Sequence, residues 1–167
     1  MIPNFDFAPI AALDFTAIKA KLMHKAGERW SLERADAVER EYRRFLLLMK
    51  TYPDEQTAPS VDVDTFWHYH ILDTMKYAAD TQKVFGYFLH HYPYLGMGDE
   101  DDEQMRVASG ERMRELYEAT FAEAYPAAPA GSTDARAPAY CGVAAQAATS
   151  YCGVAAKAQT AYCGVAA

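Results

Sequence analysis

The stretch SLERADAVEREYRRFLLLMKTYP, residues 31–53, decides the fold class. Its apolar and aromatic residues fall on one stripe of an α-helix, opposite a charged face; the stripe consists of Ala35, Val38, Tyr42, Phe45 and Met49. Ser31 suits the N-cap position, because its hydroxyl can accept a hydrogen bond from a free backbone N–H. Pro53 favours an end to the helix, because the residue before a proline avoids the helical conformation. The stretch therefore predicts a long amphipathic helix.

Helical periodicity continues on both sides of this stretch. A preceding helix is indicated by apolar residues on one face, namely Phe15, Ile18, Leu22 and Ala26. A further helix is expected from about Ser60 to about Lys83, apolar on more than one side and therefore central. The acidic run from Asp99 to Glu103 suits the N-terminus of a last long helix, where negative charge is favoured. No stretch alternates long enough to require a sheet, so the predicted fold is all-α, a compact bundle of four to five helices followed by a disordered repeat tail.

The composition divides the 167 residues into three parts. Residues 1–125 form the predicted helical, metal-binding domain. Residues 126–139 are a low-complexity linker with too few large apolar side chains to fold. Residues 140–167 contain three identical copies of Tyr-Cys-Gly-Val-Ala-Ala, which repeat every 11 residues.

Charge and hydropathy exclude several classes of partner. The net charge is −7, and an acidic domain favours neither nucleic acid, whose phosphates need a basic surface, nor an anionic membrane surface. No window reaches the roughly 18 apolar residues of a membrane-spanning helix. The N-terminus has no basic residue before an apolar run, so it does not fit a secretory signal. We therefore expect a cytoplasmic protein, and we expect export only for a cleaved tail product.

Four of the five histidines form two groups that suit a transition-metal site. Asp64 and His68 are i, i+4 neighbours on a helix, so one metal ion can contact both. His90 or His91 would complete the site from the segment that follows the helix. Copper or iron is the favoured ion, because oxidation of the Tyr-Cys repeats needs a redox-active metal, and zinc is the alternative.

A second set of ligands stays open. His68 and His70 differ by about 200° around a regular helix, so both cannot face one ion. His70 with Asp73, at i, i+3, is the alternative set. Structural roles compete with both sets: His70 suits a buried residue bonded to Asp73, and His90-His91 suits a solvated helix end. His24 is isolated in the sequence and is expected at the surface.

Residues 61–96 resemble the bacterial type of the glycine-rich domain-containing protein-like family. The resemblance rests on Trp67, His68, His70, Leu72, Asp73, Thr74, Tyr77, Asp80, Phe85, Gly86, His90 and His91. It implies a helical fold and no defined mechanism. Members of that family often have a cysteine after the aspartate, where this chain has Thr81, so the resemblance implies no thiolate within the domain.

The tail resembles the repeated cores of ribosomally synthesised, post-translationally modified peptide precursors. Two such classes, the borosins and the burpitides, fuse a modifying domain to its own substrate. Phenol and thiol are the most readily oxidised groups of each repeat. The expected modification sites are Tyr140, Cys141, Tyr151, Cys152, Tyr162 and Cys163.

Three hypotheses follow for the function. The favoured one is a self-modifying precursor, in which the metal-binding domain oxidises or cross-links the Tyr-Cys repeats of its own tail in natural product biosynthesis. In the alternative, the domain is only a leader or docking module for separate modifying enzymes, with a protease and an exporter as further partners. In the third, the tail thiols serve metal binding or storage without modification, since thiolates select soft ions.

Overall fold

The computed structural model describes residues 6–126, and within that range it contains six helices and no strand. The helices are α1 (Ala8–Ala11), α2 (Thr16–Met23), α3 (Leu32–Thr51), α4 (Val61–Leu72), α5 (Thr74–Phe85) and α6 (Glu100–Phe121). The all-α prediction is therefore confirmed. The three tail repeats and all but the first residue of the predicted linker lie outside the described residues.

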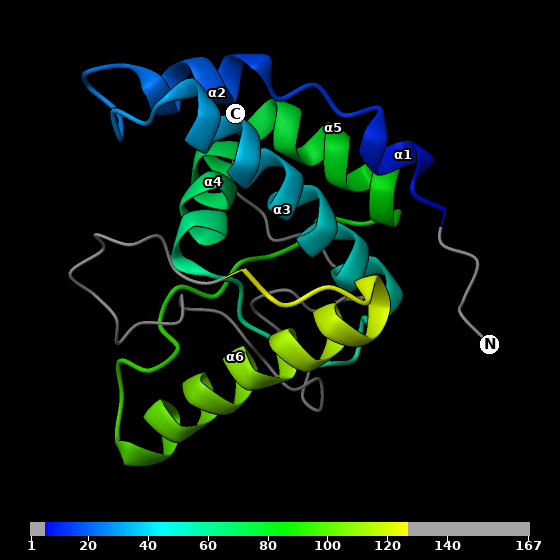
Figure 1. The fold of residues 1–167 in the computed structure, drawn as a ribbon, viewed down its shortest axis with the longest axis vertical. Helices are drawn as coiled ribbons and strands as arrows, with labels where there is room; N and C mark the ends of the chain where they lie inside the picture. Colours follow the sequence, from blue (N-terminus) through cyan, green and yellow to red (C-terminus); the bar gives the residue numbers. More distant parts are fainter. Residues whose placement is uncertain (1–5, 127–167) are drawn as a thin grey trace, which may run out of the picture.

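Helix α3 is the centre of the bundle. It packs against α1, α2, α4 and α6, while α4 also contacts α2 and α5 (Figure 1). The predicted stripe of α3 is buried, and the Ser31 hydroxyl accepts a hydrogen bond from the Arg34 N–H at 3.1 Å. The helix ends at Thr51, just before Tyr52-Pro53. Sequence and structure therefore agree on this helix and both of its ends.

The predicted helix from Ser60 to Lys83 is wrong, because the chain turns at Asp73. Asp73 has φ −86° and ψ 71°, and it separates α4 from α5. The turn allows both helices to bury an aromatic side chain in one core, and the Trp67 indole N–H donates to the Tyr77 hydroxyl at 2.8 Å. A single straight helix with two buried faces would have needed another element packed against each face. The break lets α5 cover α4 instead.

The C-terminal helix follows the prediction closely. Asp99 caps α6 by accepting a hydrogen bond from the Asp102 N–H at 3.1 Å, and four acidic residues occupy the first turn. Met113 and Leu116 are buried as expected, whereas Met105 is exposed. Among residues 6–126, no helix is both long and apolar enough to cross a bilayer.

Candidate metal centre

Three side chains with metal-ligating atoms converge at one point: Asp64, His68 and His91. The Nε2 atoms of His68 and His91 are 3.0 Å apart. His91 Nε2 lies 3.0 Å from Asp64 Oδ1, and His68 Nε2 lies 3.5 Å from Asp64 Oδ2. The i, i+4 spacing thus brings Asp64 and His68 together as expected, and the histidine that joins them is His91.

The first turn of α4 fixes the carboxylate. The Ser60 hydroxyl caps the helix by accepting from the Val63 N–H at 3.5 Å, and the Asp64 N–H donates to the Ser60 carbonyl at 2.8 Å. Asp64 therefore lies near the positive end of the helix dipole, which stabilises a negative charge. Its side chain is only 10% exposed. A buried carboxylate needs hydrogen-bond donors or a cation nearby.

His91 lies after α5, and the aromatic core fixes its place. Its ring lies against the Trp67 ring, with centroids 4.5 Å apart in an edge-on arrangement. Nearby, the Tyr77 hydroxyl donates to the Leu89 carbonyl, two residues before His91. Tyr77 therefore ties α5 and the His91 segment to Trp67, because its hydroxyl oxygen also accepts a hydrogen bond from the Trp67 indole N–H. The sequence offered no local signal for this supporting role of Tyr77.

Two of the three groups lie within hydrogen-bonding distance of one nitrogen of the third. A ring nitrogen of neutral histidine carries either one hydrogen or one lone pair. His91 Nε2 contacts both the carboxylate of Asp64 and the Nε2 of His68 at 3.0 Å. If it carries a hydrogen, it can donate fully to only one of them; if it carries a lone pair, it faces a negative carboxylate oxygen. One cation between the three groups would satisfy all of them.

The spacing fits three neighbouring positions around one ion. At metal–ligand bonds of about 2.0–2.2 Å, neighbouring ligand atoms lie about 2.9–3.5 Å apart and opposite ones above about 4 Å. The two Nε2 atoms, 3.0 Å apart, belong to the first class, and each of them lies 3.0 or 3.5 Å from one of the two Asp64 carboxylate oxygens. The three groups would therefore lie on one side of an ion. The His68 side chain is 46% exposed, so the remaining positions around such an ion would face solvent.

The protonation state also suits metal binding. Burial lowers the pKa of His68, and the nearby His91 lowers it further, while the Asp64 carboxylate opposes both effects. A neutral imidazole is the form that binds a metal ion. At neutral pH, both causes of the lowered pKa keep the lone pair of His68 available.

The other histidines lie elsewhere. The His90 ring packs on the Phe88 ring at 4.9 Å, burial lowers its pKa, and it is not part of the convergent group. His24 is exposed, as expected, and its Nδ1 accepts from the Ala26 N–H at 3.1 Å. Of the predicted pair His90-His91, only the second joins Asp64 and His68.

The alternative set of His70 and Asp73 is not assembled. His70 is 1% exposed, its Nε2 lies 3.0 Å from Asp80 Oδ2, and its Nδ1 lies 2.9 Å from the Tyr42 hydroxyl. Burial lowers the pKa of His70 to about 4, against the opposing effect of Asp80. Both ring nitrogens are therefore used within the core. His70 is a buried structural histidine, but its partner is Asp80, because Asp73 forms the exposed junction between α4 and α5.

The link between Tyr77 and the His91 segment leads to a first prediction. Tyr77→Phe removes the hydroxyl that bonds both Trp67 and Leu89. We expect metal affinity to fall by about 10–100-fold, because supporting groups of metal ligands typically contribute that much. The measurement is a competitive metal titration against a chromophoric chelator. Tyr69→Phe is the matched control, since its hydroxyl bonds only Glu28 at the surface; equal affinities of both variants would contradict the supporting role.

A family model covers most of the domain and corrects the resemblance inferred from the sequence. The model described as UCP032817-like matches residues 7–115, which include α1 to α5 and most of α6. Comparisons with curated proteins and with solved structures found no match. The resemblance to the glycine-rich domain-containing protein-like family is wrong, because a different family matches the segment that suggested it. The chain belongs to the UCP032817-like family.

Proposed function

We propose that this chain is a metalloprotein whose Asp64, His68 and His91 hold one divalent transition-metal ion, and that dioxygen oxidises the Tyr-Cys repeats of the same chain at this ion. The observation that carries the first half is the convergence of Asp64, His68 and His91, in which His91 Nε2 lies 3.0 Å from both other groups. The second half is supported by the sequence, which places all three cysteines in the tail.

The ligand set favours iron(II) for this site. Two imidazoles and one carboxylate on one face of the ion, with the other positions open, are typical of non-haem iron(II) sites that use dioxygen. Square-planar copper(II) would need two of three ligands opposite each other, more than about 4 Å apart, whereas the two imidazole nitrogens are 3.0 Å apart and each has an Asp64 oxygen within 3.5 Å. Zinc also fits the three ligands, but it cannot support a redox reaction.

The proposed reaction is a two-electron oxidation with dioxygen as the oxidant. The cysteine loses its S–H hydrogen, the tyrosine ring loses one C–H hydrogen, and one C–S bond forms between them. Two protons and two electrons pass to dioxygen, which becomes hydrogen peroxide. The metal supplies the path for electron transfer. The protein's own residues bind the ion and leave one side of it open to the repeat.

Loading the full chain with iron(II) without oxygen, and then admitting air, tests this function. We expect each cross-link to lower the mass of the tail by two hydrogen atoms, about 2 Da, in a form that a thiol reductant does not reverse. A disulfide gives the same mass but is reversed by the reductant, so the two products are distinguishable. Peptide mapping assigns the mass change to individual repeats.

The controls separate this function from its alternatives. His91→Ala should leave the tail mass unchanged, while His90→Ala should not affect the reaction. A metal-loaded chain whose tail never changes in air overturns self-modification. If the change then appears only with a separate enzyme, and survives His91→Ala, the domain is a docking module instead.

A further inference from the structure

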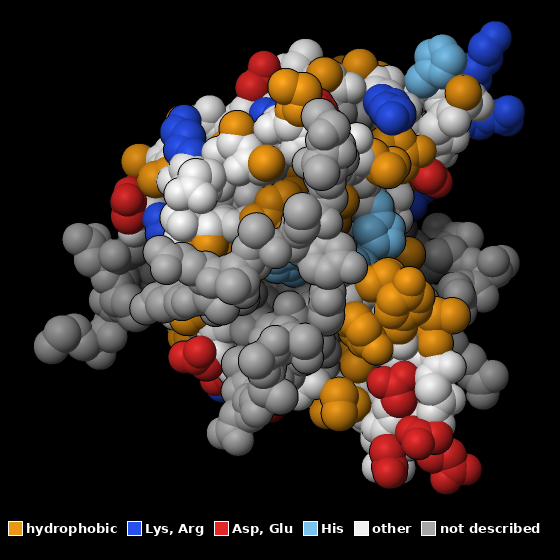
Figure 2. All heavy atoms as spheres, turned by 180° about the vertical axis from the view of Figure 1, so that it is seen from behind, with side chains coloured by type: hydrophobic (Ala, Val, Ile, Leu, Met, Phe, Trp, Pro, Cys, Tyr) orange, Lys and Arg blue, Asp and Glu red, His pale blue; other side chains and the backbone are white. Residues whose placement is uncertain are grey.

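An exposed stripe of α4 crosses the candidate metal centre. At 100° per residue, Val61, His68 and Leu72 lie within about 40° of one another around the helix. Val61 is 45% exposed and Leu72 is 67% exposed, and the His68 side chain lies between them at 46% exposure. Two apolar side chains thus flank the solvent-facing ligand. Histidine side chains also reach the surface beside hydrophobic side chains on the face of the molecule drawn in Figure 2.

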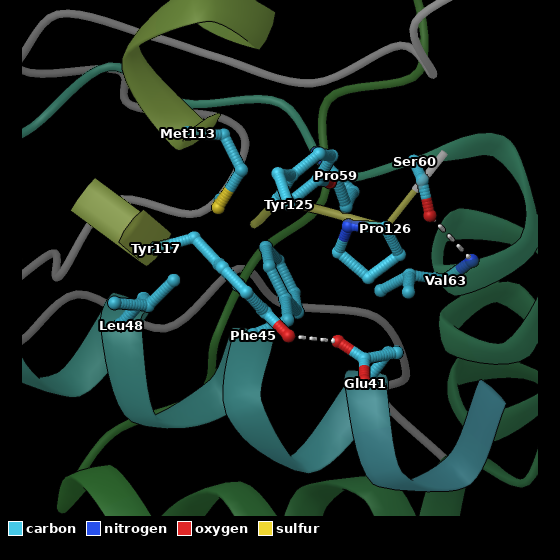
Figure 3. Close-up of a pocket in the computed structure, with 10 residues that line it drawn as sticks. All are labelled: Glu41, Phe45, Leu48, Pro59, Ser60, Val63, Met113, Tyr117, Tyr125 and Pro126. Atoms are coloured by element: carbon cyan, nitrogen blue, oxygen red, sulfur yellow. Dashed lines mark hydrogen bonds between the residues drawn. The ribbon is translucent and has the colours of Figure 1, made fainter. Parts of the chain in front are cut away.

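The described chain ends beside the start of the same helix. Tyr125 and Pro126 line a small pocket together with Ser60 and Val63, at the N-terminus of α4 (Figure 3). The Tyr125 ring packs edge-on against Tyr117 with centroids 5.1 Å apart, and burial raises the pKa of Tyr125 to about 12. The tail therefore leaves the domain from a fixed point, next to the N-terminal end of the exposed stripe.

The length of chain beyond this point is sufficient to return to the metal centre. Along α4, the distance from Ser60 to His68 corresponds to a rise of about 12 Å. The first cysteine, Cys141, is 15 residues after Pro126, and 15 residues can span up to about 50 Å. Cys152 and Cys163 have longer connections. The connection from Pro126 to each repeat is therefore long enough for the repeat to reach the stripe of the same chain.

The chemistry of the tail matches what the centre lacks. Three ligands leave positions open on a transition-metal ion, and residues 1–126 contain no cysteine. A thiolate is a strong ligand for the metals that accept imidazole and carboxylate. Each repeat also places Tyr before and Val two residues after its Cys, which are apolar groups suited to Val61 and Leu72.

We infer that a tail cysteine binds the metal directly as a thiolate, with the Tyr and Val of its repeat packed on Val61 and Leu72. This inference rests on the proposed metal centre, and it identifies how the substrate reaches that centre. The repeat occupies an open position on the side of His68. When the cysteine binds, its thiol proton passes to solvent and no oxidation takes place. The binding is therefore measurable without dioxygen.

Cobalt(II) is the probe for direct thiolate binding in the full chain without oxygen. We expect visible d–d bands from cobalt in the centre, and a strong near-ultraviolet band from sulfur-to-cobalt charge transfer. The triple variant Cys141→Ser, Cys152→Ser and Cys163→Ser should keep the visible bands and lose the near-ultraviolet band. Visible bands without a charge-transfer band in the unmodified chain overturn the inference and leave the centre intact. No cobalt spectrum at all overturns the proposed metal centre itself.

A second comparison tests the apolar stripe. The double change Val61→Ser with Leu72→Ser should lower the equilibrium constant for thiolate binding to cobalt by roughly tenfold, because each change removes apolar contact area. The visible bands should persist. Met75→Ser is the matched control, since Met75 is 86% exposed and belongs to α5. An unchanged charge-transfer band in the double variant overturns the assigned surface, and a band that grows with protein concentration overturns binding within one chain.

Discussion

Replacing His91 by alanine should lower the metal affinity of the chain by at least about 100-fold. His91 Nε2 is the atom that contacts both other ligands, at 3.0 Å each. Without it, one imidazole and one carboxylate remain, and two ligands do not close a site that typically needs three from the protein. The effect should exceed that of removing a supporting group, which usually costs about 10–100-fold.

The neighbouring histidine supplies a matched control for this change. His90→Ala removes the same kind of side chain one position away, from a ring that packs on Phe88 rather than on the three ligands. Affinity should stay within about twofold of the unmodified chain. Elemental analysis after gel filtration and competitive titration measure both variants, and circular dichroism checks their helix content. Loss of metal in the His90 variant, with retention in the His91 variant, would show that His90 rather than His91 belongs to the site.

Asp64→Asn and His68→Ala extend the same test to the other two ligands. Asn keeps the shape of Asp64 but removes the charge that balances a divalent cation, and its side chain is largely buried in the structure. His68→Ala should match His91→Ala in direction. His24→Ala should have no effect, because His24 is exposed near the end of α2. Agreement of all three ligand variants would tie the loss to the centre rather than to one residue.

The sequence could predict the parts of this site that depend on local geometry. Asp64 and His68 are one helical turn apart, so their proximity follows from the period of the helix alone. The same period separated His68 from His70 correctly. The cap at Ser31 and the acidic start of α6 were also readable, because they depend on a few neighbouring residues.

The parts that were missed depend on contacts distant in the sequence. The choice between His90 and His91 is made by the loop after α5, where Trp67 packs against one ring and Phe88 against the other. The break at Asp73 does not interrupt the apolar pattern, so periodicity continued through it. Because the break turns α5 back, Asp80 rather than Asp73 meets His70. No local pattern encodes such a turn.

Replacing His70 by alanine should lower the free energy of unfolding by about 3–5 kcal/mol. The change removes a fully buried ring, which leaves a cavity, and large-to-small changes in a core usually cost several kcal/mol. It also leaves the Tyr42 hydroxyl and the Asp80 carboxylate without their partner. A buried polar group without a partner adds about 1–3 kcal/mol, although Lys76, 2.7 Å from Asp80, retains part of the compensation for the carboxylate.

Urea denaturation of the metal-free chain measures this loss, with Asp73→Ala as the comparison. Asp73 is exposed and its side chain makes no cap hydrogen bond for α5, so its replacement should change stability by less than about 0.5 kcal/mol. Under conditions where the His70 variant is still folded, it should bind one metal ion as the unmodified chain does. The reason is that the ring nitrogens of His70 face Tyr42 and Asp80 rather than the centre. A stable His70 variant that loses its metal would reverse the assignment, since it would make His70 a ligand and Asp64, His68 and His91 a surface cluster.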